Sequence, residues 1–396
     1  MRLAPVLRRL DRLIVPPRRP KSVRPLAEPD RIALRDLLVR DYYSPQFPPG
    51  YLDTTEGRLD LWTHLTGRVE VARTTFVPWL DSIRPLEGAR VLEIGCGTGG
   101  GTVAFAEQGA RVLGIEVVPE HLGIARRRCA MYGVETELVR ANGAEMARLL
   151  RGRAFDLVIF LASLEHMTLD ERLASIAGAF DLLAPGGACI VLDTPNRLWP
   201  FDDHTAMEPF FHWLPDELAL RLGRGSPRPL FARWCGADGS DRTGLARWGR
   251  GLSYHEFDLA LGRGRFEVAS TLAEYWCGTP RRRVGLWCHR ACQLAERIES
   301  DRAAGAKPAL VSSATGARAP DAGGELLRRA RSALTARSSK RVLRAWARPD
   351  VHDGFLEPWL HLALRPARSQ AARLPCPSGA TEGPPAAPPP RPVAAG

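Results

Sequence analysis

The sequence lacks any run of eighteen consecutive apolar residues, which is about the length a membrane-spanning helix needs. Its first residues do not form the apolar core of a secretory signal either, because Arg8, Arg9, Asp11 and Arg12 interrupt the hydrophobic positions. These two absences predict a cytoplasmic location. With 45% hydrophobic and 25% charged residues, the 396-residue chain has the composition of a globular protein with one large or two ordinary domains.

The eight cysteines include no CxxC pair, and their wide, irregular spacing is not that of a disulfide framework. Cys277, Cys288, His289 and Cys292 come closest to a zinc cluster, but small apolar residues packed along helices explain them better. We therefore expect no metal site.

Acidic residues are too few to balance the basic ones, and the formal net charge is +11. Arginines alternate with apolar residues at helical spacing in two segments, 1–20 and 326–348. Such segments lie on anionic membrane surfaces or, more commonly, dock on their own domain. The charge would also suit an acidic substrate or a nucleic acid, although it gives no strong evidence for the latter. The sequence does not indicate an oligomeric state.

The middle of the chain alternates between strand-like and helical patterns. Short apolar runs of strand length cover residues 91–94, 111–115, 137–140, 156–161 and 188–192. Helical patterns lie between them, at 102–108, 119–132, 145–150 and 169–183. Two further runs, 266–272 and 359–364, complete seven strands. This order predicts an α/β fold, a Rossmann-like, doubly wound and mostly parallel seven-stranded sheet with a helical N-terminal cap and helical insertions.

The predicted organisation follows from these patterns and from shifts in composition. Its parts are a basic, disordered N-terminus at 1–30, a helical cap at 31–88, the main α/β domain at 89–272 with a substrate-side insertion at about 195–251, a helical insertion or extension at 273–350, a last strand within 351–367, and a disordered Pro/Ala-rich tail at 368–396.

A glycine-rich turn follows the first predicted strand, with Gly95, Gly97 and Gly99 separated by single residues. Glycine lets the backbone approach a ligand closely, as in nucleotide-binding turns. Glu93 lies two residues before the first glycine, where it would crowd a pyrophosphate but suit a cationic group, such as the ammonium of a methionine moiety. Glu116 ends the second strand, where a carboxylate can accept hydrogen bonds from both ribose hydroxyls. Glu116 indicates an adenosine-type ligand without choosing between cofactors, and Glu93 favours S-adenosylmethionine over a dinucleotide.

Three stretches together resemble the class I S-adenosylmethionine-dependent methyltransferases: 93–99, 155–167 and 182–187. The resemblance is closest to the small-molecule and sugar O-methyltransferases that include the ubiquinone-biosynthesis enzymes. It implies four groups of cofactor contacts. The methionine pocket would be formed by Glu93, Gly95, Cys96, Gly97 and Gly99, and the ribose site by Glu116 and Val117. The adenine site would be formed by Asn142, Gly143 and Ala144, and the sulfonium side would be lined by Leu161 and Ala162. Many relatives have Asp where this chain has Gly143, and Asn142 is the expected substitute.

Two histidines are candidate general bases for a hydroxyl acceptor, because His titrates near neutral pH. His204, with Asp203 beside it, follows the fifth strand, and His166 follows the fourth. The alternative for His204 is a loop-capping cluster, with a Mg²⁺ site at Asp202 and Asp203 as a weaker option, while His166 otherwise shapes the pocket.

We therefore predict methyl transfer to a hydroxyl of a small molecule, a lipid-linked intermediate or a saccharide. Three alternatives stay open: a nucleic-acid-modifying methyltransferase, a nicotinamide-dependent oxidoreductase and a catalytically silent cofactor-binding protein. Against the first, residues 163–166 lack the Asn/Asp-Pro-Pro-aromatic motif of enzymes that methylate amino groups of nucleic acids.

Overall fold

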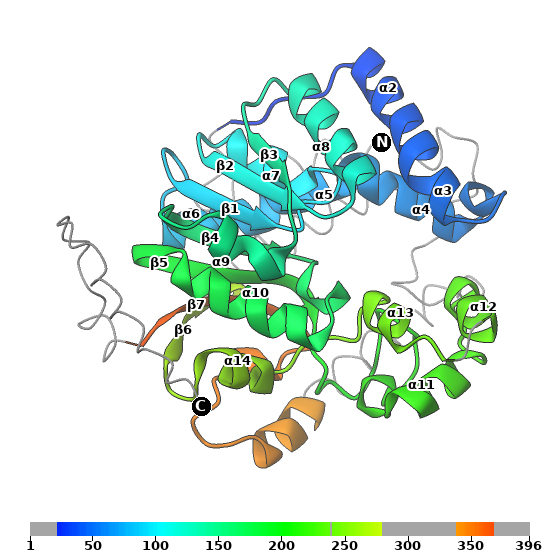
Figure 1. Ribbon diagram of the computed structural model, residues 1–396, viewed down its shortest axis with the longest axis vertical. Helices are drawn as coiled ribbons and strands as arrows, with labels where there is room; N and C mark the ends of the chain where they lie inside the picture. Colours follow the sequence, from blue (N-terminus) through cyan, green and yellow to red (C-terminus); the bar gives the residue numbers. More distant parts are fainter. Residues whose placement is uncertain (1–21, 238–239, 279–337, 368–396) are drawn as a thin grey trace, which may run out of the picture.

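The computed structural model describes residues 22–237, 240–278 and 338–367, which form one seven-stranded sheet with helices on both faces (Figure 1). The strand order is β3-β2-β1-β4-β5-β7-β6, with β7 antiparallel to both of its neighbours and the other pairs parallel. The strands are β1 Arg90–Ile94, β2 Arg111–Glu116, β3 Glu137–Arg140, β4 Phe155–Leu161, β5 Leu183–Pro195, β6 Phe266–Thr271 and β7 Trp359–Pro366. The predicted fold class is confirmed, and all seven predicted strands are present.

The central strands β1 and β4 are buried on both sides, which explains their continuous apolar runs. Leu92 and Phe160 belong to a core shared with α10 (Leu169–Asp181) and α14 (Tyr254–Leu261). Val91 and Ile159 belong to a second core, on the opposite face. The helices there are α6 (Val77–Ile83), α7 (Gly100–Ala106) and α15 (Leu272–Cys277). Between the strands of the parallel half lie also α8 (Pro119–Met131) and α9 (Met146–Leu149). With both faces covered, the carboxyl edge of the parallel strands is left for ligands.

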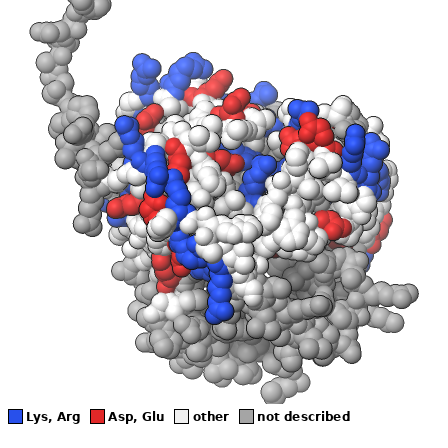
Figure 2. All heavy atoms as spheres, turned by 90° about the horizontal axis from the view of Figure 1, so that it is seen from below, with Lys and Arg blue, Asp and Glu red and all other residues white. Residues whose placement is uncertain are grey.

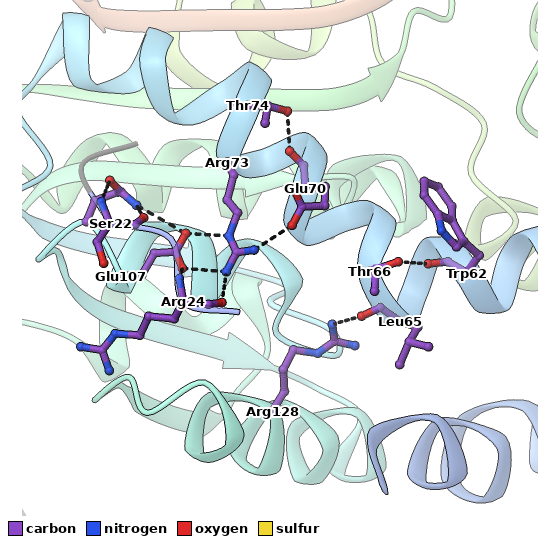
Figure 3. A network of polar contacts seen from close by, with 11 residues as sticks. Ser22, Arg24, Trp62, Leu65, Thr66, Glu70, Arg73, Thr74, Glu107 and Arg128 are labelled. Atoms are coloured by element: carbon purple, nitrogen blue, oxygen red, sulfur yellow. Dashed lines mark hydrogen bonds and ion pairs between the residues drawn. The ribbon is translucent and has the colours of Figure 1, made fainter. Parts of the chain in front are cut away.

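The N-terminal cap contains α2 (Glu28–Leu38), α3 (Ser44–Gln46), α4 (Thr55–Trp62) and α5 (Arg68–Val71), joined by π-helical turns at Val39–Tyr43, Thr63–Gly67 and Ala72–Phe76. Its main anchor is Arg73, which donates to both carboxylate oxygens of Glu107, at 2.7 and 2.8 Å, and to the carbonyl of Arg24 (Figure 3). The side chains of Arg73 and Glu107 are almost completely buried. The cap is therefore fixed to the helix that follows the glycine-rich turn.

The expectation of a disordered N-terminus is wrong for residues 22–30. Arg24 donates its backbone N–H to Glu107 and its guanidinium to the Gly133 carbonyl, and α2 already begins at Glu28. The basic composition of this segment concealed its tertiary partners. Residues 1–21 and the predicted tail, 368–396, lie outside the described residues.

The segment after β5 forms a small helical lobe with α11 (Asp216–Gly223), α12 (Pro229–Ala237) and α13 (Arg242–Arg247). Its own core is built from Phe211, Phe231 and Leu245. Arg247 of this lobe forms an ion pair with Glu171 of α10 and donates to the carbonyl of His166. The lobe is thus attached beside the carboxyl end of β4.

The basic segment 326–348 is described only from residue 338, where a helix covers 338–346. Leu343 is buried in the main core, and Arg348 pairs with Asp258 of α14. This part of the segment docks on its own domain. In the described part of the chain, no helix is both long and apolar enough to cross a membrane. Most of the region 273–350 lies outside the described residues. So do Cys288, His289 and Cys292 of the weak zinc pattern.

Candidate active site

The turn after β1 adopts backbone angles that favour glycine. Gly95, Gly97 and Gly99 have φ values of +73°, +52° and +81°. A Cβ at Gly95 would lie 2.7 Å from the Cβ of Ser163, whereas a Cβ at Gly97 would meet no atom within 4 Å. The turn therefore touches the exit of β4 on one side and leaves open space on the other, as a backbone cradle for a ligand requires.

Glu93 is fully buried beneath α7, where its Oε2 accepts a hydrogen bond from Thr102 at 2.5 Å. Burial raises the pKa of this carboxyl to about 8, with the nearby charge of Glu116 acting in the same direction. A cation bound at the turn would favour the charged form. Its contact with a methionine ammonium stays a prediction.

Glu116 organises the turn, and its contact with a ribose stays a prediction. Its Oε2 accepts from the backbone N–H of Gly97, and its Oε1 accepts from Val117 and Val118, all at 2.9–3.0 Å. Val117 leaves 55% of its surface exposed. The structure thus brings Glu116 into contact with the turn and leaves the Val117 side chain open beside it.

The exit of β3 contains no carboxylate. A Cβ at Gly143 would lie 3.0 Å from Ile94 and 3.1 Å from Ser175, so an aspartate would not fit here without movement. Asn142 caps the following turn, with its Oδ1 accepting from the N–H of Ala144. The NH₂ of the Asn142 side chain is the part left for the predicted contact with an adenine.

The exit of β4 lies against the turn. Leu161 is half-buried, and Ala162 has a φ of +49°, which a non-glycine residue rarely adopts. The buried hydroxyl of Ser163 has no hydrogen-bond partner among the described residues. Cys96, in contrast, points away, because its Sγ lies near Gly114 of β2 and it is 95% buried. Only the backbone of Cys96 faces the turn.

The two candidate bases lie together, with ring centroids 5.5 Å apart. His166 comes from a short turn after β4, and its Nδ1 lies 2.8 Å from the carbonyl of Arg247. His204 comes from the loop after β5. Surrounding protein and the charges of nearby groups, including Arg228, hold the pKa of both imidazoles below its ordinary value. Both rings are therefore neutral at pH 7.

The neighbouring aspartates have structural partners. Asp202 accepts from the backbone N–H groups of three residues, His204, Thr205 and Ala206, and pairs with His212. This is the geometry of a capped loop, and it leaves Asp202 unsuited to Mg²⁺. Asp203 accepts from the indole N–H of Trp359 at 3.2 Å and lies beside His204. It links the loop to β7.

Two functional candidates were missed from the sequence. Arg68 packs its Cβ 3.1 Å from the Cβ position of Gly100, directly over the start of α7, and its side chain has no ion-pair partner among the described residues. Glu165 lies between β4 and His166 with a completely buried side chain. The only signal for Glu165 in the sequence was its place after a strand. Arg68 had no signal, because its position depends on how the cap packs against α7.

The chain is similar to known methyltransferases in its central part. A family model described as a methyltransferase domain matches residues 91–187. The ubiquinone biosynthesis O-methyltransferase of Pseudomonas aeruginosa is 36% identical over 121 residues, 31% of this chain and 50% of that protein. The enzyme of the same name from Rhizobium etli is 33% identical over 170 residues, 41% of this chain and 66% of that protein. The chain thus spans about half the length of the first curated relatives it matches.

Among solved structures, the magnesium protoporphyrin IX methyltransferase of Synechocystis PCC 6803 with bound SAH is similar to 60% of this chain and 85% of that one. The match has 19% identity and a TM-score of 0.36. At this score the likeness adds nothing to the sheet order described above.

Proposed function

Because the chain contains a class I S-adenosylmethionine-dependent methyltransferase domain, we propose that it transfers a methyl group from S-adenosylmethionine to a hydroxyl of a small molecule. The observation that carries the proposal is that two contacts lie close together in the fold. The glycine-rich turn at Gly95 packs against Ser163, and three residues later His166 faces His204. A ligand cradle and two neutral imidazoles thus lie side by side at the carboxyl edge of the sheet.

The residues at the turn fit the cofactor's chemistry. Gly97 leaves open space, Glu116 has carboxylate oxygens for the ribose hydroxyls, and the unpartnered hydroxyl of Ser163 can bond to a polar group. Arg68, which approaches the N-terminus of α7, is suited to the methionine carboxylate. When bound, the cofactor supplies an electrophilic methyl on a positively charged sulfur.

The protein's own part is to align the acceptor and remove its proton. In the transfer, an O–C bond forms, the S–C bond breaks, and the products are a methyl ether, S-adenosylhomocysteine and one proton. His204 is the proposed proton acceptor, held next to Asp203 and Trp359, and His166 shapes the same space.

Calorimetric titration of the full chain with S-adenosylhomocysteine, with NAD⁺ in parallel, tests the cofactor. Micromolar binding of S-adenosylhomocysteine alone is expected. Binding of NAD⁺ alone would favour the oxidoreductase alternative, which the domain match does not support.

The acceptor is tested by measuring S-adenosylhomocysteine release with a panel of phenols, quinols, hexoses and a short RNA. The relatives named ubiquinone biosynthesis O-methyltransferase favour the phenols and quinols. His204→Ala is expected to slow turnover while cofactor affinity is retained. Turnover with RNA alone would move the proposal to nucleic acid, and no turnover with bound cofactor would indicate a silent scaffold.

We also propose peripheral contact with an anionic membrane, consistent with a lipid-linked acceptor and a cytoplasmic location. Three aromatic side chains, Phe210, Trp213 and Trp346, form an exposed cluster with ring centroids 4.9 and 6.4 Å apart. Trp346 is 72% exposed. The underside of the molecule has basic and acidic side chains interspersed beside a broad uncharged area (Figure 2). Exposed tryptophan is typical of surfaces that enter the lipid headgroup region.

A further inference from the structure

Three potential ligand atoms converge at the acceptor side of the proposed site. Glu165, His166 and His204 each offer one such atom, and these atoms lie within 4.8 Å of one another. They come from two separate loops, the exit of β4 and the loop after β5, which the sheet brings together at its carboxyl edge. Glu165 and His166 are adjacent in one short turn, whereas His204 joins them only through the fold.

Glu165 is the most unusual member of this cluster. Its side chain is completely buried, and its Oε1 has no hydrogen-bond partner within the described residues. Oε2 has a single contact, a 3.3 Å hydrogen bond from the hydroxyl of Thr194. His166 Nε2 lies 3.8 Å from Oε1, too far for a hydrogen bond. A buried carboxylate oxygen without a partner is costly, so a missing positive group is indicated.

The hydrogen bonds of the two histidines show which ring atoms face the cluster. His166 Nδ1 lies 2.8 Å from the carbonyl of Arg247, which can only accept, so Nδ1 carries the proton. His204 Nδ1 lies 3.4 Å from Thr205 Oγ1, whose own hydrogen is donated to the carbonyl of Gly249. Thr205 Oγ1 can therefore only accept from the ring. Both imidazoles keep an Nε2 lone pair without a proton.

The cluster thus contains two imidazole lone pairs and a carboxylate oxygen that has no hydrogen-bond partner among the described residues. We propose that Glu165, His166 and His204 bind a divalent transition-metal ion. Two histidines and one carboxylate are the ligand set of catalytic Zn²⁺ and of non-haem Fe²⁺, and both kinds of site leave coordination positions open. Bonds of about 2.1 Å place such ligand atoms roughly 3.4 Å apart, so the side chains have to close by about an ångström.

The second coordination shell is also present. The carbonyl of Arg247 fixes the ring of His166, and Thr205 fixes that of His204. Such partners orient metal-binding histidines. Resting on the proposed function, the ion would bind the acceptor hydroxyl and lower its pKa. With Nε2 of His204 bound to the ion, the hydroxyl proton would pass to water, so the ion replaces His204 as the group that activates the acceptor. The sequence, with its scattered cysteines, did not predict this site.

The test is metal binding itself, without cofactor or acceptor. The full chain is stripped with a chelator, and Co²⁺ is titrated while the visible absorption of the bound ion is recorded, followed by competition with Zn²⁺. We expect one Co²⁺ bound with a spectrum of nitrogen and oxygen ligands. His204→Ala and Glu165→Gln should each weaken binding at least tenfold. The exposed histidine variant His255→Ala is the matched control.

Folding and the proposed function are controlled separately. Each variant should still bind S-adenosylhomocysteine, which the metal ligands do not contact, and Glu165→Gln preserves the side-chain shape if His204→Ala fails to fold. Absence of Co²⁺ binding, or equal binding by the wild type and Glu165→Gln, overturns the metal site. A thiolate spectrum would assign the ion to cysteines and would also overturn it. The chain can bind Co²⁺ at this site and still fail to transfer a methyl group. It can also transfer a methyl group without binding Co²⁺, so the two proposals fail separately.

Discussion

Glu116 combines two tasks in a single carboxylate. It accepts three backbone N–H groups, which fixes the glycine-rich turn, and its position at the end of β2 suits it to the ribose. Glu116→Ala is expected to weaken binding of S-adenosylhomocysteine by about 1–3 kcal/mol, since charged hydrogen bonds are lost. Calorimetry measures this directly.

Glu116→Gln separates the two tasks, because its amide oxygen still accepts one or two backbone bonds while the charge is removed. Its affinity should lie between those of the wild type and the alanine variant. Unchanged affinity in Glu116→Ala, with a folded protein by circular dichroism, would remove Glu116 from the ribose site.

At the same scale, spacing along the sequence predicted the position of candidate residues that lie at a strand end. Gly95, Gly97 and Glu116 are of this kind, because the backbone itself delivers them to the carboxyl edge. Arg68 and the unpaired oxygen of Glu165 are of another kind. Their roles arise from contacts between segments far apart in the chain, so no local pattern could identify them.

At the scale of elements, one buried ion pair is the main polar anchor of the cap. Arg73 binds Glu107 through two hydrogen bonds and also contacts Glu70 and the carbonyl of Arg24. Arg73→Met should lower the free energy of unfolding by about 3–5 kcal/mol, because the carboxylate of Glu107 would be left buried and unpaired. Urea unfolding at neutral pH is the measurement.

Arg31→Met is the control for the Arg73 variant, because it removes an exposed pair with Glu28 and should cost about 0–1 kcal/mol. Adding Glu107→Leu to Arg73→Met should recover part of the loss. Equal effects of Arg31→Met and Arg73→Met would show that the buried pair does not anchor the cap.

The attachment of the helical lobe to α10 should depend on pH. Hydrogen bonds from Arg247, and from the N–H of Thr168, lower the pKa of Glu171 to about 2. A lowered carboxyl pKa means stability that is fully present above about pH 4.5 and is lost as the pH falls towards 2. Glu171→Gln should therefore destabilise the protein by about 1–3 kcal/mol at pH 7 and by progressively less below pH 4.

Thermal unfolding of wild type and variant across pH 3–7 checks this. Glu137→Gln, which removes a pair whose two side chains are about half exposed, should change the melting temperature little at any pH. A Glu171→Gln difference that stays constant from pH 7 to pH 3 would contradict the assignment.

The limits of prediction at this scale follow from burial. Long runs buried on both faces, such as 156–161, gave strands nearly at their observed bounds, and the helix predicted at 169–183 was found as Leu169–Asp181. Residues 22–30 were predicted wrongly, because their order comes from Glu107 and Gly133, more than eighty residues away. Composition describes a segment's solubility better than its partners.

For the whole molecule, the aromatic cluster joins the lobe after β5 to the helix 338–346, two parts that meet on one side of the sheet. The cluster gives the membrane proposal a specific test, since the basic residues of that helix are largely occupied. Lys340 pairs with Glu357, and Arg344 donates to the carbonyl of Val351 and pairs with Asp353. Binding should therefore depend more on the aromatic rings than on these charges.

The double variant Trp213→Ser/Trp346→Ser should reduce co-sedimentation with phosphatidylglycerol vesicles at least fivefold, because two amphipathic rings leave the headgroup region. Ile32→Ser, a similarly exposed apolar site in the cap, should leave it unchanged. If the wild type does not bind these vesicles, or if the double variant binds as well as the wild type, this surface does not contact membrane. Because the cluster lies outside the glycine-rich turn, S-adenosylhomocysteine affinity should be the same in every variant, which separates membrane contact from cofactor binding.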